Sequence, residues 1–103
     1  AKEQMPNHKS SERELEENLH KLREQIDQLD REVIALLKKR KDVVRIISEL
    51  KSQNNLPVVQ DSRWNEILQN AITEARKNDL SEDMIQVIFR AIHEESVRLQ
   101  SKK

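Results

Sequence analysis

Apolar residues recur along the first half of the chain at the spacing of a single helix face. The steps between them alternate between four and three residues, first through Leu15, Leu19, Leu22, Ile26, Leu29, Val33 and Leu36, and again through Val43, Ile47 and Leu50. This alternation is typical of an amphipathic helix with one apolar stripe. Ser11 and Glu14 have the spacing of a capping box, and the first breaker is the segment 54–57, Asn-Asn-Leu-Pro. The pattern predicts a helix from about Glu12 to about Ser52.

Two shorter helices are predicted after the break. The second begins near Asp61 and ends near Asn78, and Ser81 is a good N-cap for the third. Their apolar faces consist of Trp64, Ile67, Leu68, Ala71, Ile72 and Ala75, and of Met84, Ile85, Ile88, Phe89, Ile92 and Leu99. No segment shows the period-two alternation of a strand. The predicted fold is all-α, with one long and two shorter helices per chain.

The length of the first helix bears on assembly. About 40 residues at ~1.5 Å each make a helix of roughly 60 Å. A globule of this chain length has a radius of gyration of only ~13 Å, and the two short helices cannot cover the whole apolar stripe. The rest of the stripe must pack on another chain, so we expect an intertwined homodimer.

Composition removes several classes of function. The 103 residues suit one domain, and 19 Lys and Arg balance 19 Asp and Glu, which argues against nucleic acid as a partner. The absence of Cys excludes thiolate chemistry, and the absence of Gly excludes a glycine-rich phosphate loop. No apolar run has the length of a membrane span and no signal-peptide pattern is present, so we expect a cytoplasmic protein. Residues 1–11 are polar and contain Pro6, and are predicted to be a disordered tail or linker remnant before a domain at 12–103.

Two cations interrupt the apolar face of the long helix. Continuing the four-three series beyond Leu36 leads to Arg40, where another leucine is expected. Lys51 lies eleven residues further on, about three turns, and so shares a face with Arg40. Inward-facing cations need an anion, because an unpaired buried charge costs several kcal/mol. Either a bound anion meets this need, or the carboxylates of Glu94 and Glu95 do.

Other polar residues extend this candidate anion site. Arg23 is 17 residues before Arg40, roughly 25 Å along a helix, so it can serve such a site only in a partner chain. The alternative is a solvated arginine beside the stripe. Ser96 and Gln100 continue the inward face of the third helix, although Gln100 would be solvated if the helix end frays. Arg63 is by default a surface residue. His93 lacks a second His four residues later, so no helical zinc site is predicted.

These residues together resemble the helical class of chorismate mutases. The resemblance begins in the segment 22–30, Leu-Arg-Glu-Gln-Ile-Asp-Gln-Leu-Asp, and continues through Arg40, Lys51, Pro57-Val58 and Arg63 to Ser96 and Gln100. It covers residues 19–100 without a gap. It implies an intertwined helical dimer in which each active site borrows an arginine from the other chain. It also implies a concerted rearrangement of chorismate, a dicarboxylate, to prephenate, with no cofactor and no catalytic base.

The resemblance also implies a role for each residue. Arg40 and the partner's Arg23 would bind the substrate carboxylates, and Ser96 would hydrogen-bond one of them. Lys51 and Gln100 would donate to the ether oxygen, and Arg63 would support the electrostatics of the site.

Two positions depart from the family pattern. The family often has acidic residues at the positions of Gln60 and Trp64, where one of them recognises the ring hydroxyl of the substrate. In this chain Gln60 or backbone amides of the loop would bind that hydroxyl instead. Trp64 either lines the site or fills the core. Because of these two departures, isochorismate–pyruvate lyase activity remains an alternative function. The non-enzymatic alternative is a catalytically silent dimerisation or regulatory module fused to a DAHP synthase.

Overall fold

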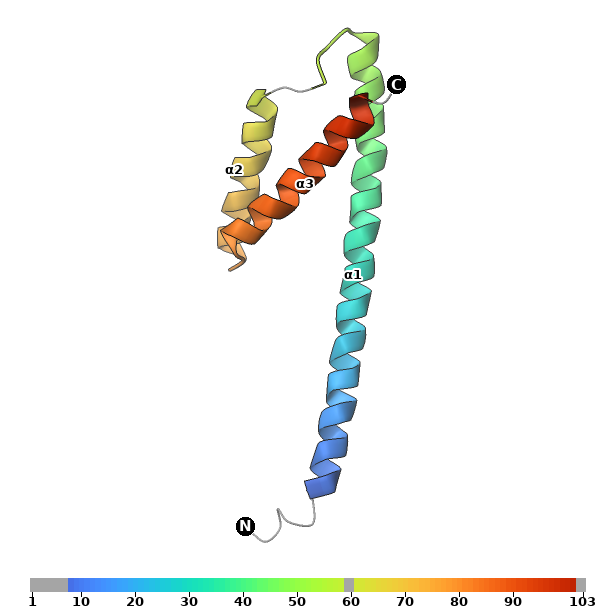
Figure 1. Ribbon diagram of the computed structural model, residues 1–103, viewed down its shortest axis with the longest axis vertical. Helices are drawn as coiled ribbons and strands as arrows, with labels where there is room; N and C mark the ends of the chain where they lie inside the picture. The colour runs from blue at the N-terminus through green and yellow to red at the C-terminus, as the bar shows by residue number, and fades with distance from the viewer. Residues whose placement is uncertain (1–7, 59–60, 102–103) are drawn as a thin grey trace. The chain divides into compact units, whose positions relative to one another are not determined.

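The computed structural model describes residues 8–58 and 61–101, and of residues 8–10 only the backbone. They form three helices, α1 (His8–Gln53), α2 (Asp61–Lys77) and α3 (Glu82–Ser101) (Figure 1). The predicted all-α fold of one long and two shorter helices is confirmed. Both ends of α2 and the start of α3 lie within a residue or two of their predicted positions.

The start of α1 differs from the prediction. The helix begins at His8 rather than near Glu12, so Ser11 lies inside it and the predicted capping box is wrong. The segment after Pro6 contains neither Gly nor Pro and is rich in Lys, Glu and Arg, which are good helix formers. Residues 1–7, most of the predicted tail, lie outside the described residues.

Two helices end with a residue in the left-handed conformation, although the chain has no glycine. Asn55 follows α1 and Asp79 follows α2, each with φ 57°. The amide of Leu56 donates to the Lys51 carbonyl at 2.8 Å, and the amide of Leu80 donates to the Ala75 carbonyl at 2.8 Å. These are Schellman closures. Asn and Asp adopt this backbone region more readily than other non-glycine residues, so each helix stops sharply before the next segment.

The start of α3 is capped as predicted. The amide of Met84 donates to the Ser81 hydroxyl oxygen at 3.1 Å. This bond satisfies one of the amides that a helix leaves without an internal partner.

The chain divides into two units, residues 1–39 and 40–103. The first contains the N-terminal part of α1, whose apolar stripe is exposed: Leu22 is 54% accessible, Ile26 55% and Val33 54%. No helix among the described residues is long and apolar enough to cross a membrane.

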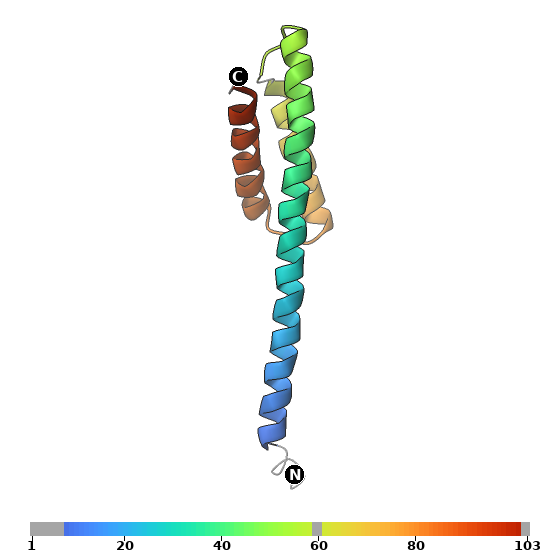
Figure 2. The same cartoon turned by 90° about the vertical axis from the view of Figure 1, so that its right-hand side faces the viewer.

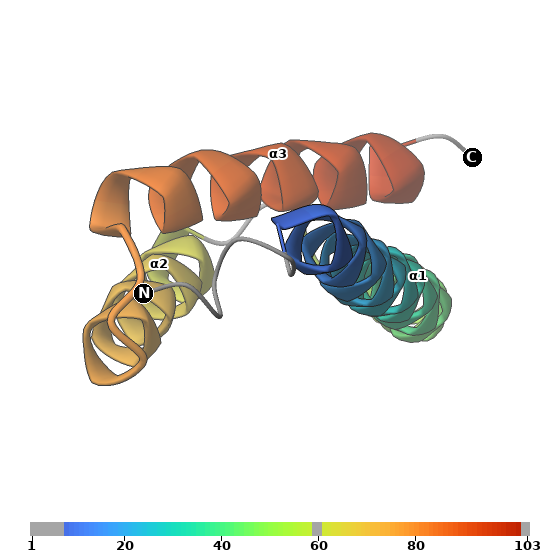
Figure 3. The ribbon, with the colours of Figure 1, turned by 90° about the horizontal axis from the view of Figure 1, so that it is seen from below.

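The second unit contains the end of α1 together with α2 and α3. Helix α3 packs along α2 and, at its C-terminal end, lies beside the end of α1 (Figures 2 and 3). Ala71 and Ala75, one turn apart on α2, are buried, and their small side chains allow the helices to approach closely. Apart from these alanines, Val44 is the only buried hydrophobic residue that the described segments contain. The apolar core of a single chain is therefore small.

Candidate active site

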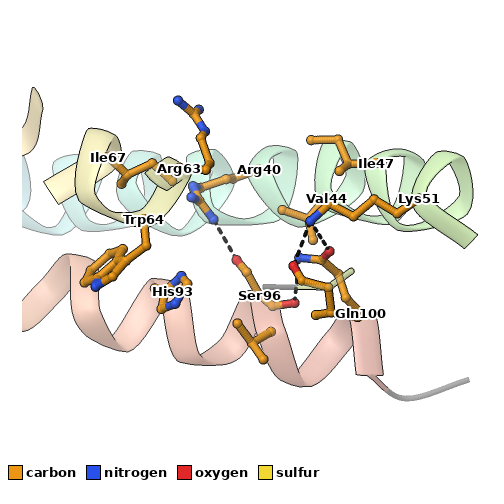
Figure 4. A pocket seen from close by; sticks show the side chains of 12 residues that line it. Arg40, Val44, Ile47, Lys51, Arg63, Trp64, Ile67, His93, Ser96 and Gln100 are labelled. Atoms are coloured by element: carbon orange, nitrogen blue, oxygen red, sulfur yellow. Dashed lines mark hydrogen bonds between the residues drawn. The ribbon is translucent and has the colours of Figure 1, made fainter. Parts of the chain in front are cut away.

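All three helices of the second unit contribute to one pocket. Its volume is about 240 Å³. The lining residues are Arg40, Val44, Ile47 and Lys51 of α1, Val58, Arg63, Trp64 and Ile67 of α2 and the preceding loop, and His93, Ser96, Val97 and Gln100 of α3. Figure 4 shows these side chains around the cavity. The predicted common face of Arg40 and Lys51 is confirmed, and Val44 and Ile47 lie on the same face between them.

Arg40 is half-buried and is held by α3. Its Nη1 donates to the Ser96 Oγ at 2.8 Å (Figure 4). That hydroxyl in turn donates to the Ile92 carbonyl at 2.9 Å. Burial lowers the pKa of Arg40, and the nearby charge of Arg63 lowers it further. Both effects mean that the surroundings disfavour this positive charge, although an arginine remains protonated at neutral pH. An anion in the pocket would relieve the same unfavourable interaction.

Lys51 and Gln100 are joined directly. The Lys51 Nζ donates to the Gln100 Oε1 at 2.9 Å and to the Val58 carbonyl at 2.8 Å. The Gln100 Nε2 donates to the Ser96 carbonyl at 3.3 Å. Gln100 is only 9% accessible, so the alternative of a solvated side chain on a frayed helix end is wrong. Both polar heads are therefore fixed at the same end of the pocket.

The carboxylates that were the alternative partners for these cations lie elsewhere. Glu94 and Glu95 are exposed, and Glu95 forms an ion pair with Arg98 on its own helix. Among the residues that the structure describes, no carboxylate is within ion-pair distance of Arg40 or Lys51. The internal neutralisation considered from the sequence does not occur within one chain.

The remaining side of the pocket is formed by α2 and by the middle of α3. Arg63 is exposed at the rim, where its Nη1 pairs with Glu66 Oε1 at 2.5 Å. Trp64 is half-buried and stacks on His93, with ring centroids 4.2 Å apart and an interplanar angle of 16°. Trp64 thus lines the pocket instead of filling a closed core.

The structure places the other predicted residues differently. Arg23 is exposed on α1 in the first unit. Gln60 lies outside the described residues. The sequence predicted no role for Val58, because every residue type has a backbone carbonyl and the contact therefore cannot be recognised from the side chain. His93 was considered from the sequence as a zinc ligand and excluded as one, although its spacing of three and seven residues from Ser96 and Gln100 already indicated the pocket face.

The chemistry of the lining suits a small anion with several oxygen atoms. Three cationic side chains surround the cavity, and Ser96 and Gln100 add neutral hydrogen-bonding groups. Arginine forks bind carboxylates through paired hydrogen bonds, whereas a lysine supplies a point charge. Within the described segments no cluster of three or more His, Asp or Glu could hold a metal ion.

The fold and the pocket thus define an all-helical domain with a pocket lined by three cationic side chains. Residues 22–101 match the family described as chorismate mutase type II, and the chain belongs to that family. It is 39% identical over 80 residues to the T-protein of Haemophilus influenzae, covering 78% of this chain and 21% of that protein. It is 35% identical over 85 residues to the bifunctional chorismate mutase/prephenate dehydratase of Buchnera aphidicola subsp. Schizaphis graminum, covering 82% of this chain and 22% of that protein.

A third relative has the same name as the Buchnera protein. The bifunctional chorismate mutase/prephenate dehydratase of Aquifex aeolicus is 38% identical over 56 residues, covering 54% of this chain and 16% of that protein. The chain spans about a fifth of the length of the first two relatives. The two bifunctional names combine the mutase with a prephenate dehydratase, and they give no support to the DAHP synthase fusion that the sequence left open as an alternative.

Proposed function

We propose that this domain converts chorismate to prephenate by a concerted [3,3] rearrangement. The observation that carries the proposal is a pocket with three cations and with no carboxylate paired to Arg40 or Lys51 in the described part of the chain. Chorismate carries two carboxylates, so it supplies the negative charge that this pocket lacks. Membership of the chorismate mutase type II family supports the same substrate. We place the reaction in the cytoplasm.

The residues of the pocket would act by positioning and by electrostatics. Arg40, held by Ser96 at 2.8 Å, is oriented in advance to bind one carboxylate. Lys51 and Gln100 would donate to the ether oxygen, which gains negative charge as its bond to carbon breaks. Donors fixed before the reaction stabilise that charge without reorganisation. The Gln100 oxygen accepts a hydrogen bond from Lys51, and its amide nitrogen retains one hydrogen for a ligand.

A homodimer with shared sites is part of the proposal. The exposed apolar stripe of the first unit supports it, because burying a leucine or isoleucine side chain contributes ~1.5–3 kcal/mol. A second copy is the partner whose own stripe matches this one. The second carboxylate would then be bound by Arg23 of the other chain.

The activity is tested by incubating the purified chain with chorismate and identifying the product. Loss of chorismate absorbance with formation of prephenate is the expected result. Salicylate and pyruvate would instead identify the lyase reaction considered from the sequence. A folded protein that leaves chorismate unchanged would refute the proposal and favour the non-catalytic module.

Shared sites are tested by mixing two inactive variants. Arg23→Ala and Lys51→Ala each remove one half of every site, so each homodimer should be nearly inactive. After random subunit exchange about half of the dimers are mixed, and one of their two sites is intact, which predicts recovery of about a quarter of the wild-type activity. Mixing Arg40→Ala with Lys51→Ala is the matched control. If each site forms within one chain, neither mixture recovers activity.

A further inference from the structure

The pocket has an aromatic wall whose polar atoms are unused. Trp64 of α2 and His93 of α3 stack face to face at 4.2 Å, and both rings line the cavity (Figure 4). Among the described residues, no hydrogen bond is formed by the His93 ring nitrogens or by the Trp64 indole N–H. Both side chains are only half-buried, so their polar atoms remain open to a ligand.

The other polar groups of the pocket already have partners. Arg40 is bonded to Ser96, whose hydroxyl hydrogen goes to the Ile92 carbonyl. Lys51 is bonded to Gln100 and to the Val58 carbonyl. Ligand recognition at the stacked pair therefore requires no existing bond to break. A buried polar group of a ligand costs free energy unless it finds such a partner.

We propose that His93 binds the ring hydroxyl of the substrate and that Trp64 is the positioning residue that holds the imidazole in place. The inference rests on the proposed function, which assigns the two carboxylates and the ether oxygen to other residues. The hydroxyl is the one polar group of chorismate left without a partner. An imidazole suits it in either protonation state, because the neutral ring can accept the hydroxyl hydrogen and the protonated ring can donate to the hydroxyl oxygen.

The stacking of Trp64 on His93 holds the imidazole in place before a ligand binds. A ring pressed against a neighbouring ring at 16° has few rotamers available, so little conformational entropy is lost when it binds a ligand. Trp64 and His93 come from different helices, so the contact also fixes α2 against α3 at the pocket. Removing the indole should therefore weaken hydroxyl recognition even where His93 itself is unchanged.

The test compares chorismate with an analogue that lacks the ring hydroxyl. Each kcat/KM is divided by the uncatalysed rate of the same compound, so differences in intrinsic reactivity cancel. We expect the wild type to favour chorismate by roughly 10–100-fold, the usual effect of one well-placed hydrogen bond. His93→Leu should lose most of this preference, with little change for the analogue, and His93→Gln should keep part of it. Trp64→Phe should retain more of the preference than Trp64→Leu.

Binding is measured separately through the fluorescence of Trp64, the only tryptophan of the chain. Titration with chorismate and with the analogue gives a Kd for each compound, even in a protein that does not turn over. A chain that binds chorismate more tightly than the analogue but leaves it unchanged would overturn the proposed function alone.

Three results would overturn the role of His93. One is an equal loss for both compounds in His93→Leu, which indicates a structural effect. Another is an unchanged preference in that variant. The third is loss of the preference in Gln60→Ala instead, which would assign the hydroxyl to the loop before α2.

Discussion

Replacing Lys51 by methionine removes the pocket's ammonium group while retaining a long unbranched side chain. The Lys51 Nζ donates to the Gln100 Oε1 at 2.9 Å and to the Val58 carbonyl at 2.8 Å, so the variant loses both hydrogen bonds. Gln100 is only 9% accessible, and a buried acceptor left without its donor costs about 1–3 kcal/mol. Part of that loss of stability is offset, because removing one of the three pocket cations also reduces the repulsion between them.

The kinetic effect should be larger than the structural one. Loss of a donor aimed at developing negative charge typically costs on the order of 10²–10³ in kcat. We therefore expect Lys51→Met to lower kcat by that factor, with unfolding in urea showing only the smaller loss of stability. Lys41→Met, an exposed lysine of the same helix, is the matched control and should leave kcat unchanged. A folded Lys51→Met protein with kcat within a few-fold of wild type would show that the ammonium does not stabilise the transition state.

Further predictions concern one pocket residue and two helix ends. Gln100→Glu should be active only where the new carboxyl is protonated, because an ionised carboxylate beside Lys51 cannot donate. Its kcat should fall as the pH rises through the titration range of that carboxyl, about 4.3 for a free glutamic acid side chain, while the wild-type kcat stays flat. A variant profile as flat as that of the wild type would contradict this. Ser81→Ala should lower the free energy of unfolding in urea by about 0.5–2 kcal/mol, because the amide of Met84 loses its acceptor at 3.1 Å. Asp79→Gly should leave the protein at least as stable and Asp79→Val should destabilise it by ~1–2 kcal/mol, given the φ of 57°; equal stabilities would count against the strained helix end.

The periodicity of the chain was sufficient to predict its helices. Apolar steps of three and four residues fit only one type of element, and Ser81 and the Asn54–Pro57 break are local signals that need no tertiary contact. The start of α1 was the exception. A polar segment of good helix formers without Gly or Pro has no local stop, so the apparent cap at Ser11 did not begin the helix.

The cationic face of the pocket also follows from spacing, because Arg40 and Lys51 are on the same side of one helix whatever packs against it. What pairs with those cations does not follow from spacing. The sequence placed Ser96 and Gln100 on the inward face of the third helix but still allowed Glu94 and Glu95 as partners of the cations. Only the packing of α3 against the end of α1 decides that Ser96 and Gln100 meet the cations while the two carboxylates face solvent.

The sequence by itself determined the three helices, the uncovered apolar stripe and the row of cations, because each depends on the repeat of a single helix. Only the tertiary structure determined the Lys51–Gln100 bond, the Val58 carbonyl and the stacking of Trp64 on His93, because each joins segments far apart in the chain. Residue type and spacing along one helix carry no information about how a second helix is rotated against it. That rotation decides which atoms face the pocket.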